Sequence, residues 1–260
     1  MTLEPALASA LRTLARTGHL LVALDFDGTL APLVERAEDA RALPASATAL
    51  RELAGLPGTT TALISGRALE SLRAVADPPP EAMLIGSHGA EAWTGPGAAP
   101  LSLTEGQAEL LARAVSVVER VAAAHTGTRV EYKPAGVVLH TRTADDAVAA
   151  AAVDAARTDL AALHGLGISD GKRVLEVSVL SADKGQGLAL LRRESGATAV
   201  LFAGDDVTDE DAHRTLGPDD LGVRIGTGDT AASFTVEDPA AFSEVLQRLV
   251  RLRGARAPRD

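Results

Sequence analysis

The stretch L-L-V-A-L-D-F-D-G-T at residues 20–29 decides the fold. Its five leading apolar residues predict a buried strand, which Asp25, Asp27 and a turn at Gly28 follow directly. Alternate side chains of an extended segment share a face, so the two carboxylates point the same way unless the turn re-aims one of them. Neighbouring carboxylates repel each other, and a divalent metal with a preference for oxygen ligands, such as Mg²⁺, would relieve the repulsion. The alternative interpretation is an acidic turn that only closes a strand.

Length and composition indicate a globular protein of enzyme size. The 260 residues, of which 46% are hydrophobic and 2% aromatic, suffice for a large core plus a second, smaller domain. The formal net charge is −10 and the sequence has no basic cluster. Nucleic-acid binding requires phosphate neutralisation by Lys and Arg, so we expect no nucleic-acid partner.

The sequence contains no cysteine, which excludes disulfides, thiolate catalysis and a cysteine zinc site. No apolar run approaches the roughly 20 residues of a membrane span. Glu4, Arg12 and Arg16 interrupt the apolar positions of the first 19 residues, which is not typical of a signal peptide. We therefore expect a soluble, cytoplasmic monomer without a membrane partner.

Helical patterns alternate with short apolar runs over the first third, which predicts a parallel α/β sheet. We expect strands over 20–24, 59–64 and 83–85. Polar clusters follow the last two of them, S-G-R at 65–67 and G-S-H-G-A-E at 86–91. Ligands of such sheets gather beyond the carboxyl ends of the strands, so these clusters are candidate site residues.

The middle third has a different pattern. The Gly/Pro-rich T-G-P-G-A-A-P at 94–100 indicates a boundary, and a helix over 103–125 and a hairpin of 129–133 with 137–140 follow it. A helix over 143–163 and strands over 167–169 and 173–177, with a turn at D-G 170–171, repeat the order. Helix plus hairpin, twice, predicts an inserted α+β domain with an antiparallel sheet over 95–180.

The parallel pattern returns after residue 181. The sequence predicts a helix to 194, strands over 198–203 and 221–225, and a last helix from 239, with a frayed tail beyond 252. Residues 1–94 and 181–260 then form one core domain that the middle third interrupts. A mobile insert of this kind can open and close over a site.

Four polar clusters in this order resemble the haloacid dehalogenase (HAD) superfamily of aspartyl phosphotransferases. They are Asp25 with Asp27, Ser65, Lys184 and Asp205, each placed at a strand end or a helix start. The resemblance covers the first and last thirds and implies a HAD-like Rossmannoid α/β core with a parallel sheet and an inserted α+β cap. Phosphoryl transfer needs a nucleophile, in-line geometry and positive charge over the phosphate oxygens, and these residue types supply them.

The resemblance implies a role for each of these residues. Asp25 is the catalytic nucleophile, and Asp27 is the acid and base that protonates the leaving oxygen and later deprotonates water. The Asp25 and Asp205 side chains and the Asp27 main-chain carbonyl hold Mg²⁺. Lys184 places a positive charge near the nucleophile, and Ser65 donates a hydrogen bond to the phosphate.

Structural alternatives remain for these positions. Ser65 followed by Gly66 could cap a helix, and Lys184 could be a solvated helix residue. Thr208 and Asp211 have the spacing of a capping box, so Asp206, Asp209 and Asp211 could be structural. We rank Asp205 above Asp206 and Asp209 as a metal ligand, with Asp209 as a partner of the ligands.

The middle third indicates the substrate. R-V-E-Y-K at 129–133, V-V-L-H-T-R at 137–142 and G-K-R-V-L-E-V at 171–177 resemble trehalose 6-phosphate phosphatases, as do I-S-G-R at 64–67 and G-S-H-G-A-E. The resemblance implies that Glu131, Lys133 and Glu176 bind the hydroxyls of a disaccharide phosphate. Alternatively, Glu131 and Lys133 are one solvent-facing row of a hairpin, and Glu176 is an alternating polar position that faces water.

The remaining candidates lie in the core. Gly66 and Arg67 accompany Ser65, and the Arg67 guanidinium could reach phosphate or sugar oxygens. His88 is a further candidate substrate ligand, although it could instead stabilise its own loop. The partner is in each case a small-molecule sugar phosphate.

Two departures from the family pattern weaken the detailed sugar contacts. Asp183 stands where Asn is common, and H-T-R replaces H-Y-R at 140–142. A sucrose phosphate or mannosylglycerate phosphate phosphatase is therefore the second candidate. A receiver-type signalling domain needs no cap, and a non-catalytic sugar-phosphate sensor needs no complete catalytic set, so we rank both lower.

Overall fold

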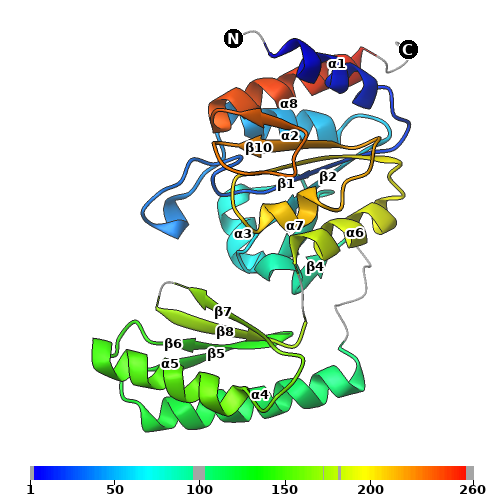
Figure 1. Cartoon of the computed structure of the whole chain (residues 1–260). Coiled ribbons are helices and arrows are strands. Elements are labelled where there is room, and N and C mark those ends of the chain that lie inside the picture. The colour runs from blue at the N-terminus through cyan, green and yellow to red at the C-terminus, as the bar shows by residue number, and fades with distance from the viewer. Residues whose placement is uncertain (1–2, 96–102, 172, 181–182, 256–260) are drawn as a thin grey trace. The chain divides into compact units, whose positions relative to one another are not determined.

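The computed structural model describes residues 3–95, 103–171, 173–180 and 183–255. Two units make up the chain: residues 1–98 with 183–260, called the core unit below, and residues 99–182, called the inserted unit. Figure 1 shows the chain leaving the core unit once and returning to it. Residues 96–100 of the predicted Gly/Pro-rich boundary and residues 256–260 of the predicted frayed tail fall outside the described residues. The start of the tail after Leu252 was predicted wrongly, because the last helix continues to Gly254.

The core unit contains a seven-stranded sheet of order β11-β10-β9-β1-β2-β3-β4. Neighbouring strands pair in parallel except β3 and β4, which are antiparallel. This confirms the predicted α/β core with a parallel sheet. The strands are β1 (Leu20–Leu24), β2 (Thr59–Ile64), β3 (Met83–Gly86), β4 (Glu91–Trp93), β9 (Ala199–Gly204), β10 (Leu221–Ile225) and β11 (Phe234–Val236).

The two strands that the sequence did not predict are β4 and β11. Each has three residues, which is too short for a recognisable alternation of apolar and polar positions. Both lie at the edges of the sheet, where a strand has one pairing neighbour. Their positions do not alter the central strands that carry the predicted site.

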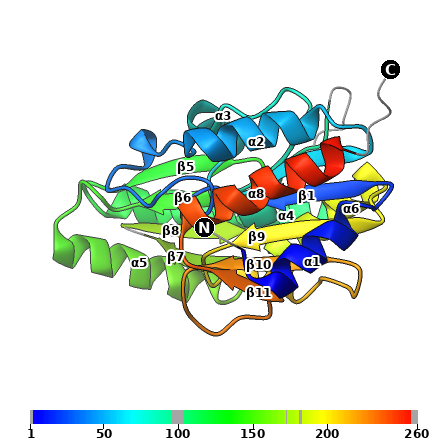
Figure 2. The ribbon, with the colours of Figure 1, turned by 90° about the horizontal axis from the view of Figure 1, so that it is seen from above.

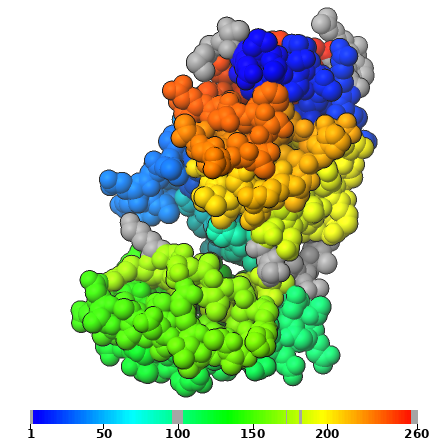
Figure 3. Space-filling model, viewed as in Figure 1, coloured from blue at the N-terminus to red at the C-terminus, as the bar shows by residue number. Residues whose placement is uncertain are grey.

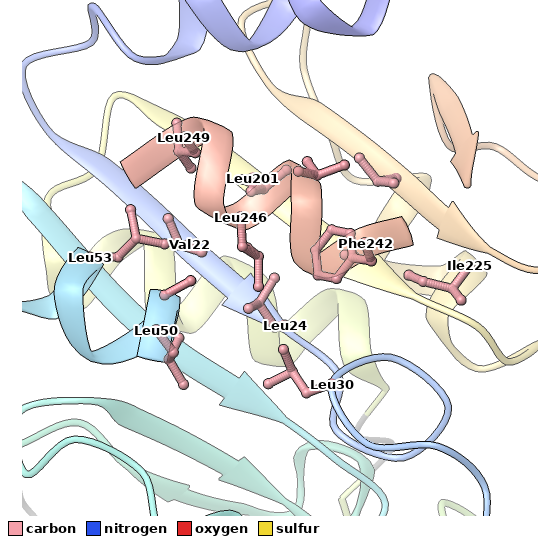
Figure 4. Close-up of a cluster of buried hydrophobic side chains, with 14 of the residues drawn as sticks. Val22, Leu24, Leu30, Leu50, Leu53, Leu201, Ile225, Phe242, Leu246 and Leu249 are labelled. Atoms are coloured by element: carbon pink, nitrogen blue, oxygen red, sulfur yellow. The ribbon is translucent and has the colours of Figure 1, made fainter. Parts of the chain in front are cut away.

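Strand β1 lies at the centre of the sheet and is buried on both faces. Leu20, Val22 and Leu24 face one cluster of core residues, whereas Leu21 and Ala23 face another. Figure 4 shows Val22 and Leu24 among leucines of neighbouring elements. An apolar run without alternation is what burial on both faces requires, and this explains L-L-V-A-L.

Helices cover both faces of this sheet. The first cluster takes its helical residues from α1, α2, α3 and α8, and the second from α6 and α7. Figure 2 shows α8 and α2 running together over the sheet. Figure 3 shows α1 against segments near the C-terminal end of the chain, which are far from α1 in the sequence. The helices are α1 (Pro5–Leu14), α2 (Pro44–Ala54), α3 (Leu69–Ala76), α6 (Lys184–Ser195), α7 (Asp209–His213) and α8 (Pro239–Gly254), with 3₁₀ turns η1 (Ala37–Asp39) and η2 (Ser87–Gly89).

The inserted unit has a four-stranded antiparallel sheet of order β5-β6-β8-β7, as the α+β prediction requires. Val137, Leu139, Leu175 and Val177 pack with residues of its two helices. The opposite face of the sheet carries polar side chains. The elements are α4 (Glu105–Ala124), β5 (Arg129–Lys133), β6 (Gly136–His140), α5 (Asp146–Leu160), β7 (Gly167–Gly171) and β8 (Val174–Ser178).

The predicted D-G turn at 170–171 is wrong. Gly171 pairs with Val174, so both residues of that dipeptide belong to β7. Arg173 has a φ of 65°, the left-handed backbone that a tight reversal demands. Asp170 instead accepts a hydrogen bond from Arg157 of α5 at 2.6 Å, a contact that sequence spacing does not reveal.

None of the described helices combines the length and apolar character that a membrane crossing requires.

Candidate active site

Three strand ends meet at the carboxyl edge of the core sheet. Asp25 follows β1, Ser65 follows β2 and Asp205 follows β9. Leu24 pairs with Leu63 on one side and with Ala203 on the other, so the three ends lie at nearly the same level. The parallel register thus brings together side chains that are 40 and 180 residues apart in the sequence.

Lys184 begins α6 and reaches into this edge. Its Nζ donates hydrogen bonds to Asp25 Oδ1 at 2.7 Å and to Asp209 Oδ1 at 2.6 Å. The Asp183 side chain accepts a hydrogen bond from Gln186 N at 2.7 Å and thereby fixes the start of the helix. The Lys184 side chain is 3% exposed, so the interpretation of Lys184 as a solvated helix residue is wrong.

Asp25, Asp205 and Asp209 form a cluster of carboxylates. One oxygen of each lies within 4.8 Å of the others. Two glycines leave room for them. A Cβ on Gly28, whose φ is 79°, would lie 2.1 Å from Asp205 Oδ2, and a Cβ on Gly204 would lie 2.1 Å from Asp209 Cγ. The small residues are therefore required for the carboxylates to approach the strand ends.

The charges of this cluster do not balance, because three carboxylates surround one ammonium group. Burial raises the pKa of Asp25 despite the opposing charge of Lys184. Burial, together with the charge of Asp209, raises the pKa of Asp205 to about 6. The carboxylates in turn raise the pKa of Lys184, although its burial opposes them. An all-oxygen donor set with excess negative charge fits a divalent cation.

Asp209 contributes more to this cluster than the sequence indicated. Its side chain is fully buried, and its Oδ2 accepts a hydrogen bond from Asp206 N at 2.9 Å. The predicted capping box of Thr208 and Asp211 is wrong, because Thr208 has helical φ and ψ and makes no side-chain cap bond. Only its second contact, with Lys184, distinguishes Asp209 from a structural acid, and no local pattern reveals that contact.

The Asp27 side chain lies apart from the acidic cluster. The Arg67 guanidinium donates hydrogen bonds from Nε to Asp27 Oδ2 and from Nη2 to Asp27 Oδ1, both at 2.6 Å. Hydrogen bonding to this carboxylate raises the pKa of Arg67. Asp25 and Asp27 therefore have different partners, Lys184 for the first and Arg67 for the second.

The S-G-R segment after β2 is bound to the turn after β3. Ser65 O accepts a hydrogen bond from His88 N at 3.0 Å, and Arg67 O accepts one from Ser87 N at 2.7 Å. A Cβ on Gly66 would lie 2.5 Å from the His88 ring, so this ring packs directly on the Gly66 backbone. Helix α3 begins at Leu69 with another residue as N-cap, so the interpretation of Ser65 as a helix cap is wrong.

The candidate residues of the inserted unit share the polar face of its sheet. Glu131 lies opposite Val138, which lies opposite Glu176. Glu131 Oε2 contacts His140 Nε2 at 2.6 Å, and Lys133 Nζ donates to Glu176 Oε1 at 2.8 Å. The three predicted sugar ligands are therefore members of two polar pairs rather than a row of separate solvated side chains.

The sequence does not predict a buried ion pair between α7 and β10. Arg224 Nη1 donates to Glu210 Oε1 at 2.9 Å, and Ala231 N donates to Glu210 Oε2 at 2.7 Å. Although burial opposes it, the hydrogen bond from Ala231 lowers the pKa of Glu210. This network ties the loop after β10 to the helix that carries Asp209. The pairing spans 14 residues, so no helical or strand spacing predicts it.

Comparisons with known proteins find similar proteins over most of the chain. The family model of trehalose-phosphatase matches residues 23–240. A trehalose 6-phosphate phosphatase of Zea mays is 31% identical over 98% of this chain and 75% of its own length. A bifunctional trehalose-6-phosphate synthase/phosphatase of Thermoproteus tenax is 33% identical over 90% of this chain. The chain spans only 32% of that protein and 19% of an uncharacterized glycosyl hydrolase of Mycobacterium tuberculosis.

A solved structure is similar over nearly the whole chain. The structure of Aspergillus fumigatus trehalose-6-phosphate phosphatase superposes with a TM-score of 0.68 at 26% identity, covering 96% of this chain and 97% of that one. The similarity extends across the core and the inserted unit, so the insertion is part of the shared fold.

Proposed function

Because the chain belongs to the trehalose-phosphatase family of phosphoric monoester hydrolases, we propose that it hydrolyses trehalose 6-phosphate to trehalose and phosphate. The observation that carries the proposal is the buried contact of Lys184 with Asp25 at the carboxyl edge of the sheet, beside Asp205 and Asp209. A nucleophilic carboxylate, a fixed positive charge and an acidic metal site are the parts that phosphoryl transfer needs.

Asp25 attacks the phosphorus in this proposal. Lys184 holds its Oδ1 and thereby orients the carboxylate, while its charge attracts the phosphate oxygens. A bond forms between Asp25 and phosphorus as the bond from phosphorus to the sugar oxygen breaks. The product of this step is an aspartyl-phosphate and free trehalose.

Asp27 handles the protons of both steps. It gives its proton to the departing sugar oxygen, which would otherwise leave as a strongly basic alkoxide. In the second step a water attacks the phosphorus, Asp27 accepts the proton of that water, and the bond to Asp25 breaks. The side chain of Asp27 lies apart from the buried acids, which supports a role distinct from theirs.

The acidic cluster is the proposed Mg²⁺ site. The Asp25 and Asp205 side chains and the Asp27 main-chain carbonyl would hold the ion, with Asp209 beside them. Bound there, Mg²⁺ would neutralise the clustered carboxylates and the charge of the phosphate. The raised pKa values of Asp25 and Asp205 support this assignment, because they reflect negative charge that Lys184 alone does not balance.

The remaining site residues bind the substrate. Ser65 Oγ accepts a hydrogen bond from Arg67 N at 3.1 Å, and a hydroxyl that accepts can still donate, here to a phosphate oxygen. Gly66 and His88 shape this end of the site, and Arg67 connects it to Asp27. Glu131, Lys133 and Glu176 would bind sugar hydroxyls, and the carboxylate and ammonium groups on one sheet face of the inserted unit suit them.

We also propose that the enzyme is a cytoplasmic monomer that acts on a small sugar phosphate. The net charge of −10 supports the absence of a nucleic-acid partner, and a sequence without cysteine fits a reducing compartment.

Phosphate release from a panel of substrates tests the proposal. The panel holds trehalose 6-phosphate, sucrose 6-phosphate, glucose 6-phosphate and mannosylglycerate phosphate, each with Mg²⁺ and with a chelator. We expect selective, metal-dependent turnover of trehalose 6-phosphate. Faster turnover of sucrose 6-phosphate or mannosylglycerate phosphate would favour the second candidate function, and equal rates across the panel would remove the substrate assignment.

The Asp25→Asn variant tests the nucleophile. We expect this variant to fold and to lose turnover of every substrate, since an amide does not attack phosphorus as a carboxylate does. Turnover close to that of the unchanged protein would contradict the aspartyl-phosphate mechanism.

A further inference from the structure

Arg67 is bound to Asp27 by two parallel hydrogen bonds. Its Nε and Nη2 each donate to a different oxygen of the carboxylate at 2.6 Å. This fork geometry fixes both the position and the plane of a carboxylate, which a single hydrogen bond does not. The Arg67 side chain is 11% exposed and that of Asp27 is 32% exposed, so the pair is partly shielded from water.

The other contacts of the guanidinium lie in the same unit. Its Cζ lies 5.7 Å from the centroid of the Phe26 ring, and its Nη1 lies 3.5 Å from Ser71 Oγ. Phe26 is the residue between the two site aspartates, and its ring is fully buried. The ring therefore gives the guanidinium a rigid support directly beside the carboxylate that it binds.

The backbone of Arg67 is fixed as well. Its amide donates to Ser65 Oγ at 3.1 Å, and its carbonyl accepts from Ser87 N at 2.7 Å. Ser87 and His88 have φ values of 48° and 55°, a left-handed conformation that is uncommon for such residues. Two strained residues in succession donate their amides to the carbonyls on either side of Gly66, so the strain serves to hold this segment in place.

We infer that Arg67 is a positioning residue for the acid and base Asp27 and not a ligand of the substrate. This inference rests on the proposed function, because it assigns Arg67 a part in the proton transfers of Asp27. The fork occupies one lone pair on each oxygen of the carboxylate, and each oxygen keeps a second lone pair for a transferred proton. This role replaces the expectation from the sequence that the Arg67 guanidinium contacts phosphate or sugar oxygens.

The leaving group discriminates between the two roles. The alkoxide of trehalose needs a proton as it departs, whereas 4-nitrophenolate leaves without one. A residue that positions Asp27 is therefore needed for cleavage of trehalose 6-phosphate and much less for cleavage of 4-nitrophenyl phosphate. A ligand of the phosphate is needed equally for both substrates. A ligand of the sugar would raise KM for trehalose 6-phosphate and leave kcat nearly unchanged.

The experiment measures the first turnover of the Arg67→Gln protein under enzyme excess with Mg²⁺, so that release of the leaving group is separated from hydrolysis of the intermediate. We expect release of trehalose to slow at least about fivefold more than release of 4-nitrophenol, with the loss in the maximal first-turnover rate and not in the enzyme concentration that gives half of it. A smaller ratio between the two losses, or a loss confined to the half-saturating enzyme concentration, overturns the inference.

A double-mutant cycle with Asp27→Asn provides the second test. If Arg67 acts only through Asp27, adding Arg67→Gln to Asp27→Asn changes the first turnover of trehalose 6-phosphate by less than about threefold. A larger further loss shows that Arg67 contacts the substrate itself and overturns the inference. A residue with a merely structural role would lower the rate both in the otherwise unchanged protein and in the Asp27→Asn variant.

Two variants control for folding. Arg67→Lys keeps the charge and loses the fork. We expect it to show the same dependence on the leaving group in a milder form. It can be measured if Arg67→Gln does not fold. Arg73→Gln removes an exposed arginine of α3 that lies 4.5 Å from the Trp93 ring, and both substrates should react as before. If the unchanged protein does not hydrolyse trehalose 6-phosphate, the proposed function fails; if it does and the leaving-group dependence is absent, only the role of Arg67 fails.

Discussion

At the scale of single residues, the state of each acid in the core unit depends on its nearest partner. Asp25 and Asp209 both accept a hydrogen bond from the ammonium group of Lys184. Asp205 accepts one from the Thr29 hydroxyl at 3.4 Å, and Asp27 accepts one from the Arg67 guanidinium Nε. Carboxylates of one chemical type thus acquire different hydrogen-bond partners. The division matches the different tasks of nucleophile, metal ligand and proton carrier in the proposed mechanism.

Gly28→Ala tests whether the close approach of Asp205 is needed. The new Cβ would lie 2.1 Å from Asp205 Oδ2 and would occupy a backbone conformation with a φ of 79°. We expect displacement of the carboxylate and a loss in affinity for Mg²⁺ of about 10-fold or more, with a parallel loss of activity. Titration of activity with Mg²⁺ measures both.

The matched control is Gly18→Ala, since a Cβ on Gly18 meets no atom within 4 Å. It should leave the titration unchanged. An unaltered midpoint in the Gly28→Ala protein would show that Asp205 does not need its present position.

We expect His213 to make the stability of the core unit depend on pH. The side chain is buried against the Phe202 ring, and both ring nitrogens lack a hydrogen-bond partner among the described residues. Burial lowers the pKa of His213 from its ordinary value of 6.5, although Glu210 and Asp209 oppose the shift. Lys184 and Arg224 act in the same direction as burial. Below pH 6.5 the unfolded chain takes up a proton that the folded chain resists, so stability falls with falling pH.

Unfolding by urea at pH 7 and pH 5 measures this effect in the metal-free protein. We expect the loss of free energy of unfolding between the two values to be smaller in His213→Leu than in the unchanged protein. His164→Leu, at an exposed histidine of the inserted unit, should retain the full loss. Identical acid dependence in all three proteins would contradict the assigned role of His213.

At the scale of elements, helix α6 places Lys184 through its first turn. Asp183 caps the helix by accepting a hydrogen bond from Gln186 N, and a Cβ on Gly185 would lie 2.6 Å from Asp211 O. The start of α6 is thereby fixed against α7, which carries Asp209. Two short stretches of chain thus control the distance between the ammonium group and both of its carboxylates.

Asp183→Ala should affect both stability and activity. Loss of an N-cap costs about 1 kcal/mol of stability, and the frayed first turn should also displace Lys184 and lower kcat. Asp238→Ala removes the equivalent cap of α8, because the Asp238 side chain accepts a hydrogen bond from Ala241 N at 2.7 Å. It should lower the free energy of unfolding by a similar amount with little change in kcat. Equal activities of the two variants would show that the cap of α6 does not position Lys184.

At the scale of the whole molecule, each unit has its own hydrophobic core. The core unit has clusters on both faces of its sheet, and the inserted unit has one beneath α4 and α5. The proposed chemistry belongs to the first unit, whereas the paired polar side chains of the sheet face belong to the second. We therefore expect substitutions in the inserted unit to alter the choice of substrate and to leave the chemical step intact.

Glu131→Ala tests this separation. It removes the partner of His140 on the polar sheet face. We expect kcat/KM for trehalose 6-phosphate to fall by the factor that corresponds to about 1 to 3 kcal/mol, the free energy of a charged hydrogen bond. Hydrolysis of 4-nitrophenyl phosphate should change little. The control is Glu119→Ala on α4, where Glu119 accepts a hydrogen bond from Tyr132 OH at 2.7 Å. Equal losses for both substrates in Glu131→Ala would make Glu131 a structural residue.

Much of the architecture could be predicted from the sequence because it depends on local pattern. The apolar runs at residues 20–24, 59–64 and 221–225 are strands with the predicted bounds. The recurrence of helix and hairpin predicted the antiparallel sheet of the inserted unit. Strands β4 and β11 and the continuation of β7 to Gly171 escaped prediction, since three-residue strands and a dipeptide turn signal carry too little pattern to compete with tertiary contacts.

The sequence by itself determined which acids stand at the ends of buried strands and in which order, because the burial of apolar runs and the alternation of helix and strand are properties of neighbouring residues. Only the tertiary structure decided which group each acid meets. Lys184 reaches an aspartate 159 residues away and another 25 residues away, and Arg67 binds an aspartate 40 residues away. Such pairings depend on the packing of strands and helices against one another, and no spacing along the chain contains that information.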